Sequence, residues 1–131
     1  MIHAFKTEDP YAVRYKIVDL DEQRNIITGF CSVASYKEAD VLRAGNAYID
    51  GPYVREDCRG RKVASRLLEY AEFFATLGFT GDIAVHLSIR EWDYEDWKAE
   101  ALFRRGYEGH RGYMGDVGMR KVLKERKEAN G

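Results

Sequence analysis

Apolar and polar residues alternate along several short segments of this chain, and that spacing predicts strands. Residues 12–18 alternate, and the polar turn at 21–25 leads into a second apolar segment, which predicts an antiparallel hairpin. Residues 82–89 alternate in the same way, and residues 112–123 indicate a final strand or hairpin. Residues 47–54 predict another strand, in which Gly51 and Pro52 should cause a bulge because proline cannot donate to a ladder.

A longer period appears after residue 62 and predicts the main helix. Apolar side chains recur at helical spacing on one face, and Gly78 should end this helix; these positions are Val63, Leu67, Tyr70, Phe74 and Leu77. Shorter helical patterns cover residues 36–43 and 94–105. The sum predicts a mixed α/β domain of roughly six strands and three helices.

Composition restricts the class of protein. The chain has 131 residues, a length that favours one domain over residues 1–123, with a frayed polar tail at 124–131. Its formal net charge is −1. Near-zero charge gives no general attraction to nucleic acid, and no apolar run could span a bilayer. Two cysteines make no disulfide framework, so a cytoplasmic location is expected. The histidines lack metal-ligand spacing, so no metal is expected.

The most informative segment joins the strand at 47–54 to the helix. Arg59, Gly60, Arg61 and Lys62 precede the first helical turn, whose backbone N–H groups have no partner within the helix. The helix dipole favours negative charge at that end, and the cationic side chains add further donors. This order of strand, cationic loop and helix N-terminus predicts a phosphate site.

The same segment resembles the acyl-CoA loop of the GNAT superfamily of N-acetyltransferases. The family signature is R/Q-x-x-G-x-G/A after a strand ending in valine, and here Arg59 and Ala64 fit, whereas Lys62 replaces the middle glycine. Residues 103–107, Phe-Arg-Arg-Gly-Tyr, are similar to the helix ending in the family, and residues 26–30 to its early hairpin. The resemblance covers residues 11–122 and implies an acyl-CoA N-acyltransferase fold with acetyl-CoA as acyl donor.

The resemblance also implies where the cofactor binds. The loop and first helical turn should hold the pyrophosphate, and the end of the preceding strand should pair with pantetheine. The residues implied are Tyr53, Val54, Arg59, Gly60, Arg61, Lys62, Val63, Ala64 and Ser65. Pro52 removes one backbone donor from that strand.

Acyl transfer to an amine needs a base for the amine and a proton for the leaving thiolate. Asp50 is the candidate base, because an acidic residue near this point often activates the amine in the family; a solvent-facing strand carboxylate is the alternative. The helix positions where the family has a tyrosine lack a hydroxyl here, so Tyr107 is the candidate acid, with Tyr94 and Tyr113 as substitutes. Tyrosines at such positions are more often core or rim aromatics than catalysts.

The expected function is acetyl-CoA-dependent acetylation of a primary amine, on a small molecule or a protein. Family members usually place helices between their first two strands to cap the acceptor site, but only residues 6–10 are available here. A reduced N-terminal helical cap implies either a large acceptor or a wall supplied by a homodimer. The alternative function is a catalytically weakened domain that binds CoA or a protein partner. Nucleic-acid binding is disfavoured by charge.

Overall fold

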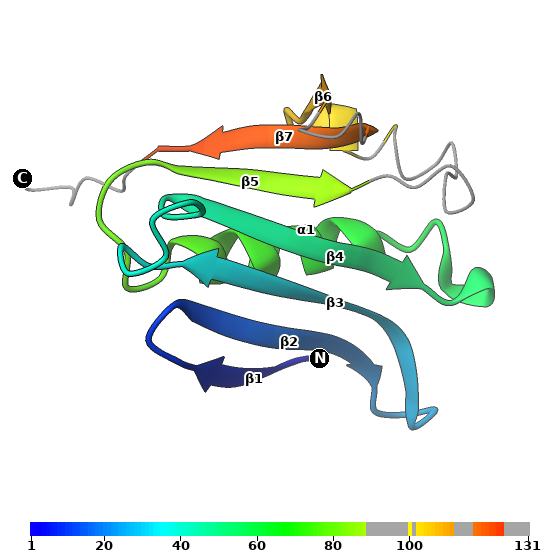
Figure 1. Ribbon diagram of the computed structural model, residues 1–131. Coiled ribbons are helices and arrows are strands. Elements are labelled where there is room, and N and C mark those ends of the chain that lie inside the picture. The colour runs from blue at the N-terminus through cyan, green and yellow to red at the C-terminus, as the bar shows by residue number, and fades with distance from the viewer. Residues whose placement is uncertain (89–99, 101, 112–116, 125–131) are drawn as a thin grey trace, which may run out of the picture.

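The computed structural model describes residues 1–88, 100, 102–111 and 117–124, and it contains one mixed sheet with a helix behind it (Figure 1). The strands follow the order β1-β2-β3-β4-β5-β7-β6 across the sheet, and all neighbours are antiparallel except β4 and β5. The elements are β1 (Ile2–Glu8), β2 (Ala12–Asp21), β3 (Ile26–Tyr36), β4 (Asn46–Val54), η1 (Glu56–Cys58), α1 (Val63–Thr76), β5 (Ile83–Ser88), β6 (Glu108–Arg111) and β7 (Val117–Leu123).

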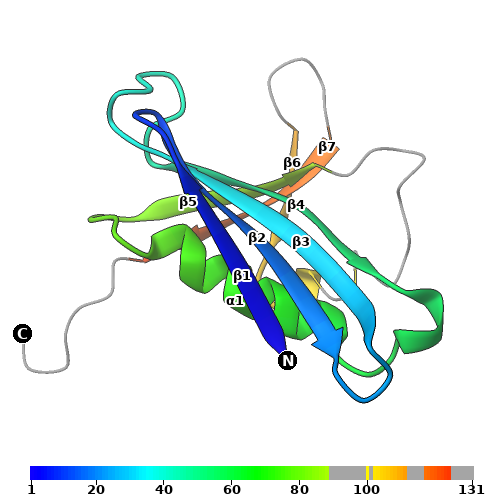
Figure 2. The same cartoon turned by 90° about the horizontal axis from the view of Figure 1, so that it is seen from below.

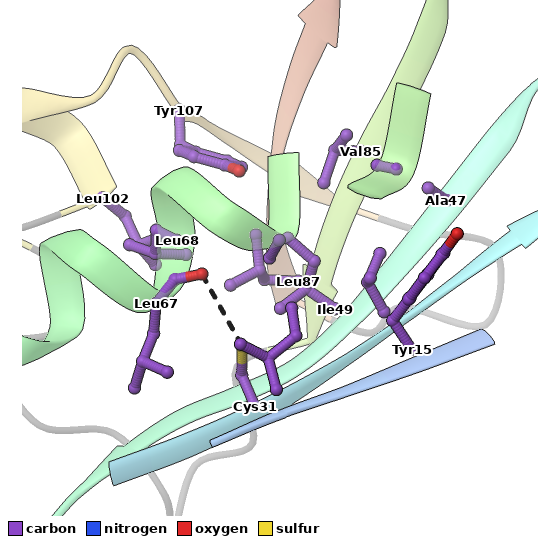
Figure 3. Packing of buried hydrophobic residues seen from close by; sticks show 14 of the residues in the cluster. Tyr15, Cys31, Ala47, Ile49, Leu67, Leu68, Val85, Leu87, Leu102 and Tyr107 are labelled. Carbon is purple, nitrogen blue, oxygen red and sulfur yellow. Dashed lines mark hydrogen bonds between the residues drawn. The ribbon is translucent and has the colours of Figure 1, made fainter. Parts of the chain in front are cut away.

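α1 covers one face of the sheet, as Figure 2 shows, and the hydrophobic core lies between them (Figure 3). Alternate residues of β2, β3, β4 and β5 point to this face and are buried, which is the period-two pattern of strands with one covered face. The fully buried Ile17, Val33, Leu67 and Val85 come from four different elements and form its centre. The mixed α/β fold predicted from the sequence is therefore confirmed.

The helix begins and ends where the sequence predicts, but its buried face is rotated. Tyr70 and Leu77 were expected to face the core, yet they are 41% and 44% exposed. The buried stripe instead consists of Val63, Leu67, Leu68, Ala71, Glu72 and Ala75. Small side chains at positions 71 and 75 let the helix approach the sheet closely. Gly78 adopts a positive φ of 80° just beyond the helix, which agrees with its predicted role as a stop.

The N-terminal region forms a hairpin with no helix inserted. β1 pairs with β2 in full register from Ile2–Asp19 to Glu8–Val13, and only residues 9–11 connect the two strands. The expected reduction of the N-terminal cap is thus confirmed. Within the described residues, the sheet face opposite α1 carries no helix, and this uncovered face is turned toward the viewer in Figure 1.

Three local expectations need correction or fall outside the described residues. The helix predicted at 36–43 is wrong, because β3 extends to Tyr36 and turns follow it. Of the helix predicted at 94–105, residues 100 and 102–104 are helical, and the remainder up to 99 and residue 101 lie outside the described ranges. The final segment pairs as a hairpin of β6 and β7, although residues 112–116 and the tail at 125–131 are not described.

Candidate functional site

The parting of β4 and β5 defines the centre of the candidate site. These strands pair from Asn46–Ala84 to Ile49–Leu87, and within the described residues the second half of β4 pairs only with β3. β5 meanwhile continues alongside β7 to Ser88. We call the opening between residues 50–54 of β4 and the end of β5 the fork; the two strands diverge there in Figure 1. Within the described residues, β4 therefore has no strand partner on this side beyond Ile49.

A bulge sets which backbone groups of β4 face the fork. Phe30 pairs with Tyr53 and Ser32 pairs with Asp50, so β4 has one residue more than β3 between these pairs, as the Gly51-Pro52 dipeptide predicted. Beyond the bulge, the N–H of Arg55 donates to the carbonyl of Thr28 on β3 at 2.8 Å. Successive amides alternate in direction along a strand.

The Val54 amide therefore points into the fork, whereas the Tyr53 amide points to β3. This alternation revises the expectation from sequence, which assigned both backbone groups to pantetheine. Only Val54 is placed to pair with an extended ligand in the fork. Two residues before Val54, the strand has Pro52, which has no backbone N–H to donate.

The cationic loop ends in a helix N-terminus that is open to an anion. Within the described part of the chain, no side chain caps the start of α1, and its first turn contains no acidic residue. The first-turn amides are therefore available to an anionic ligand. Arg59, Arg61 and Lys62 are exposed around this turn, and Gly60 has a φ of 84°. The structure thus brings together the loop residues that the sequence assigned to a pyrophosphate.

Lys62 stands where the family signature has glycine, and its backbone has the left-handed conformation that glycine favours. Its φ of 62° and ψ of 22° lie in the left-handed region, where a Cβ atom approaches a backbone oxygen too closely. A glycine adopts this conformation without that cost. Lysine at this position of the signature therefore carries the strain of a left-handed backbone.

The strain at Lys62 yields a prediction about stability. Lys62→Gly should raise the free energy of unfolding by about 1 kcal/mol relative to Lys62→Ala, because both variants lose the same charge and only alanine keeps the left-handed cost. Urea denaturation of the two variants measures the difference. Equal stability of the glycine and alanine variants would contradict a left-handed Lys62.

Asp50 lies at the apex of the fork, one residue beyond the last pair of β4 with β5. Its side chain is exposed on the uncovered face, and the Tyr53 hydroxyl donates to its Oδ1 at 2.6 Å. The Tyr53 ring in turn stacks on Phe30, with the ring centroids 5.0 Å apart. Two aromatic residues therefore orient a carboxylate beside the fork, where it could accept a proton.

Further aromatic side chains surround Asp50 on the uncovered face, and sequence reasoning assigned them no role there. Tyr48 stacks on His86 with a centroid distance of 5.1 Å, and Nε2 of that histidine lies 2.8 Å from Oδ1 of Asn46. Phe30 is 50% exposed and Tyr48 is 41% exposed. The alternation of β3 and β4 could have placed both residues on this face, but it could not show that no element among the described residues covers them.

Tyr107, the candidate acid, lies elsewhere. It is 2% exposed and packs among the core residues beside α1 (Figure 3). Its hydroxyl donates to Oε2 of Glu72 at 3.3 Å. Arg105 and Lys121 donate to the same carboxylate at 2.9 and 2.8 Å. Burial, followed by the Glu72 charge, raises the pKa of Tyr107. These contacts revise the assignment: they give Tyr107 a structural role in a buried polar cluster.

Metal-binding groups and membrane-spanning helices are both absent from the described residues. Their His, Cys, Asp and Glu side chains form no group of three or more that could hold a metal ion. None of the helices in these ranges is both long and apolar enough to cross a membrane. Cys31 and Cys58 are both buried and unbonded to each other, and burial raises the pKa of Cys31 to about 12.

Comparison with known proteins identifies the family that this fold and site define. A model of the acetyltransferase (GNAT) family matches residues 3–107, so the chain belongs to this family, whose enzymes use acetyl-CoA as acyl donor. A search of curated protein sequences found no match. The family resemblance seen in the loop is thereby confirmed over most of the chain.

Solved structures of family members share the fold at low sequence identity. The GNAT domain of PAT from S. lividans has a TM-score of 0.64 at 17% identity, over 89% of this chain and 65% of that one. PaiA N-acetyltransferase from Thermoplasma acidophilum, in complex with coenzyme A, has a TM-score of 0.60 at 13% identity, over 86% and 62%. An acetyltransferase from Bacillus cereus has a TM-score of 0.59 at 19% identity, over 84% and 73%. The chain therefore matches only part of each of these longer chains.

Proposed function

We propose that this protein is an N-acetyltransferase that transfers the acetyl group of acetyl-CoA directly to a primary amine. The observation that carries the proposal is the placement of three features around one opening. The fork, the uncapped start of α1 and the carboxylate of Asp50 all belong to the β4–α1 segment and its immediate neighbours. Together they can hold a phosphate, an extended thioester arm and an amine.

The cofactor would lie along this segment. Its pyrophosphate would accept hydrogen bonds from the first-turn amides of Val63, Ala64 and Ser65, with Arg59 and Arg61 adding charge. Pantetheine would extend along the fork and pair with the backbone of Val54, which is directed into that opening. This arrangement would bring the thioester to the apex of the fork, near Asp50.

Transfer then requires one nucleophilic substitution at the thioester carbonyl. The acceptor ammonium loses a proton to Asp50, directly or through a water, and its nitrogen attacks the acetyl carbon. The new C–N bond forms as the C–S bond breaks; the nitrogen releases its second proton to solvent, and the CoA thiolate takes a proton from solvent. Tyr107 is held by Glu72, and the substitutes Tyr94 and Tyr113 lie outside the described residues, so this scheme assigns no side chain as the leaving-group acid.

The uncovered face favours an acceptor that belongs to a larger molecule. With only residues 9–11 between β1 and β2, nothing in the described part of the chain encloses Asp50 from that side. An amine on a flexible protein segment could reach it, and exposed aromatic rings such as Tyr48 and Phe30 suit a cation. A second copy of the chain could instead supply the wall.

Buried, unbonded cysteines suit a reducing cytoplasm.

Cofactor binding gives a direct prediction. Replacing Arg59 and Arg61 together by alanine should weaken acetyl-CoA binding by about 1–3 kcal/mol, the scale of charged hydrogen bonds. Titration calorimetry measures the affinity. The matched control is the double variant Arg104→Ala with Lys124→Ala, which removes the same charge from two side chains that are 75% and 80% exposed and lie outside the loop. Equal affinity of the two double variants would place the pyrophosphate elsewhere.

Turnover separates the proposed enzyme from a binding module. Release of free CoA thiol should be measured with peptide amines and with small amines once binding is established. The alternative, a family member that binds CoA without turnover, is supported by Pro52, which removes a donor from the fork strand. Tight acetyl-CoA binding with no thiol release for any amine would favour that alternative; absence of acetyl-CoA binding would contradict both the enzyme and the CoA-binding module, and leave a module that binds a protein partner.

A further inference from the structure

A buried carboxylate lies behind the phosphate loop and is connected to it through one arginine. Asp19, on β2, is 4% exposed, and Nη2 of Arg66 donates to its Oδ2 at 2.8 Å. The Met1 amine lies 3.2 Å from the other carboxylate oxygen. Burial alone would raise the pKa of Asp19, but the hydrogen bonds from Arg66 and Met1 outweigh burial and lower it. Asp19 is therefore a charged, fixed acceptor against which Arg66 is oriented.

The second arm of the same guanidinium reaches the loop. Nη1 of Arg66 donates to the backbone carbonyl of Arg61 at 3.1 Å. A guanidinium is planar and rigid, so fixing one arm against Asp19 also fixes the direction of the other. Arg66 thus bridges a buried residue of the sheet and one particular peptide group of the loop.

Holding that carbonyl determines where the next amide points. The peptide bond is planar and trans, so the Lys62 N–H is directed opposite to the Arg61 carbonyl and away from Arg66. Lys62 itself adopts the left-handed conformation, which a non-glycine residue leaves readily unless its neighbours hold it. A left-handed residue beside right-handed helical ones turns successive amides toward a common point, which is a backbone arrangement that binds anions.

We propose that Asp19 and Arg66 are positioning residues that hold the Arg61–Lys62 peptide so that the loop amides converge on the cofactor pyrophosphate. Neither residue needs to touch the cofactor for this role. The inference rests on the proposed use of the loop for acetyl-CoA. It also explains how the loop keeps its path although lysine replaces the glycine of the family signature at position 62.

The test uses Arg66→Lys, which keeps the charge but cannot bridge two acceptors with a fixed geometry. We expect the Kd for CoA to rise about tenfold, as it should in Asp19→Asn. Arg104→Lys, an exposed position paired with Glu100, should leave the Kd unchanged. S-acetylpantetheine lacks the pyrophosphate, so kcat/KM with this truncated donor should be unaffected. An equal loss with both donors would indicate a general structural defect and overturn the proposal.

A double-variant experiment tests the mechanism itself. In a Lys62→Gly background, which has already lost the lysine charge, adding Arg66→Lys should change the Kd for CoA little, because glycine adopts the left-handed turn without being held. A further tenfold rise of the Kd in the double variant over Lys62→Gly alone would contradict the proposal.

A ligand-free measurement distinguishes failure of this proposal from failure of the proposed function. The amide and Cα chemical shifts of Lys62 report its backbone conformation without any cofactor. These shifts should move in Arg66→Lys and in Asp19→Asn, and not in Arg104→Lys. Unchanged shifts would overturn the positioning role even if CoA binds, whereas moved shifts in a protein that binds no CoA would support the role and refute only the proposed function.

Discussion

Asp50→Asn should reduce kcat by about a hundredfold or more while leaving acetyl-CoA affinity nearly unchanged. The factor is the usual contribution of a positioned general base. Asparagine preserves the size of the side chain and can still accept the hydrogen bond from Tyr53, but it cannot take a proton. The loss should shrink at high pH, where more of the amine is already deprotonated. Steady-state thiol release across pH, with calorimetry for affinity, measures both quantities.

The matched control for this variant is Glu38→Gln. Glu38 is an exposed carboxylate in the turn after β3, so this change removes one negative charge outside the fork. We expect its kcat to equal that of the original protein. Full activity of Asp50→Asn at neutral pH would exclude Asp50 as the base and leave it a solvent-facing strand carboxylate. A loss caused only by weaker acetyl-CoA binding would instead assign Asp50 to the cofactor.

Gly29→Ala should lower the free energy of unfolding by about 1–3 kcal/mol, the usual cost of overpacking a close contact. A Cβ atom at Gly29 would lie 2.8 Å from the Tyr53 carbonyl oxygen, 2.9 Å from Val63 Cγ1 and 3.0 Å from Leu67 Cδ1. The first of these is backbone and cannot rotate away. Relief of the clash should therefore move β4 and the start of α1 away from β3. Chemical denaturation measures the stability loss.

The same displacement should also weaken acetyl-CoA binding, because both the fork strand and the helix N-terminus are involved. Gly109→Ala provides the control: a Cβ at that glycine meets no heavy atom within 4 Å, and its strand position requires no left-handed backbone. Stability equal to that of the Gly109 variant would show that β3 and α1 can separate at no cost. Loss of stability with unchanged affinity would show that the site does not depend on this contact.

The sequence alone determined the parts of this protein that depend on local periodicity and local backbone chemistry. Alternation predicted β2, β4 and β5, because a half-covered sheet imposes a period of two. Helical spacing, with Gly78 beyond it, predicted α1 to within two residues. The loop of Arg59 to Ala64 also indicated the family, because a phosphate needs open amides and cations at fixed positions along the chain.

The tertiary structure decided the features that depend on how distant segments meet. Pairing of β4 with β5 ends at Ile49, and this places Asp50 at the fork; register between strands far apart in sequence is not encoded by either strand alone. Tyr107 carries a hydroxyl that could protonate a thiolate, but in the folded protein the residue packs against α1 and this hydroxyl donates to Glu72. The contact between Asp19 and Arg66 spans 47 residues and exists only once β2 and α1 pack together, which no local pattern could predict.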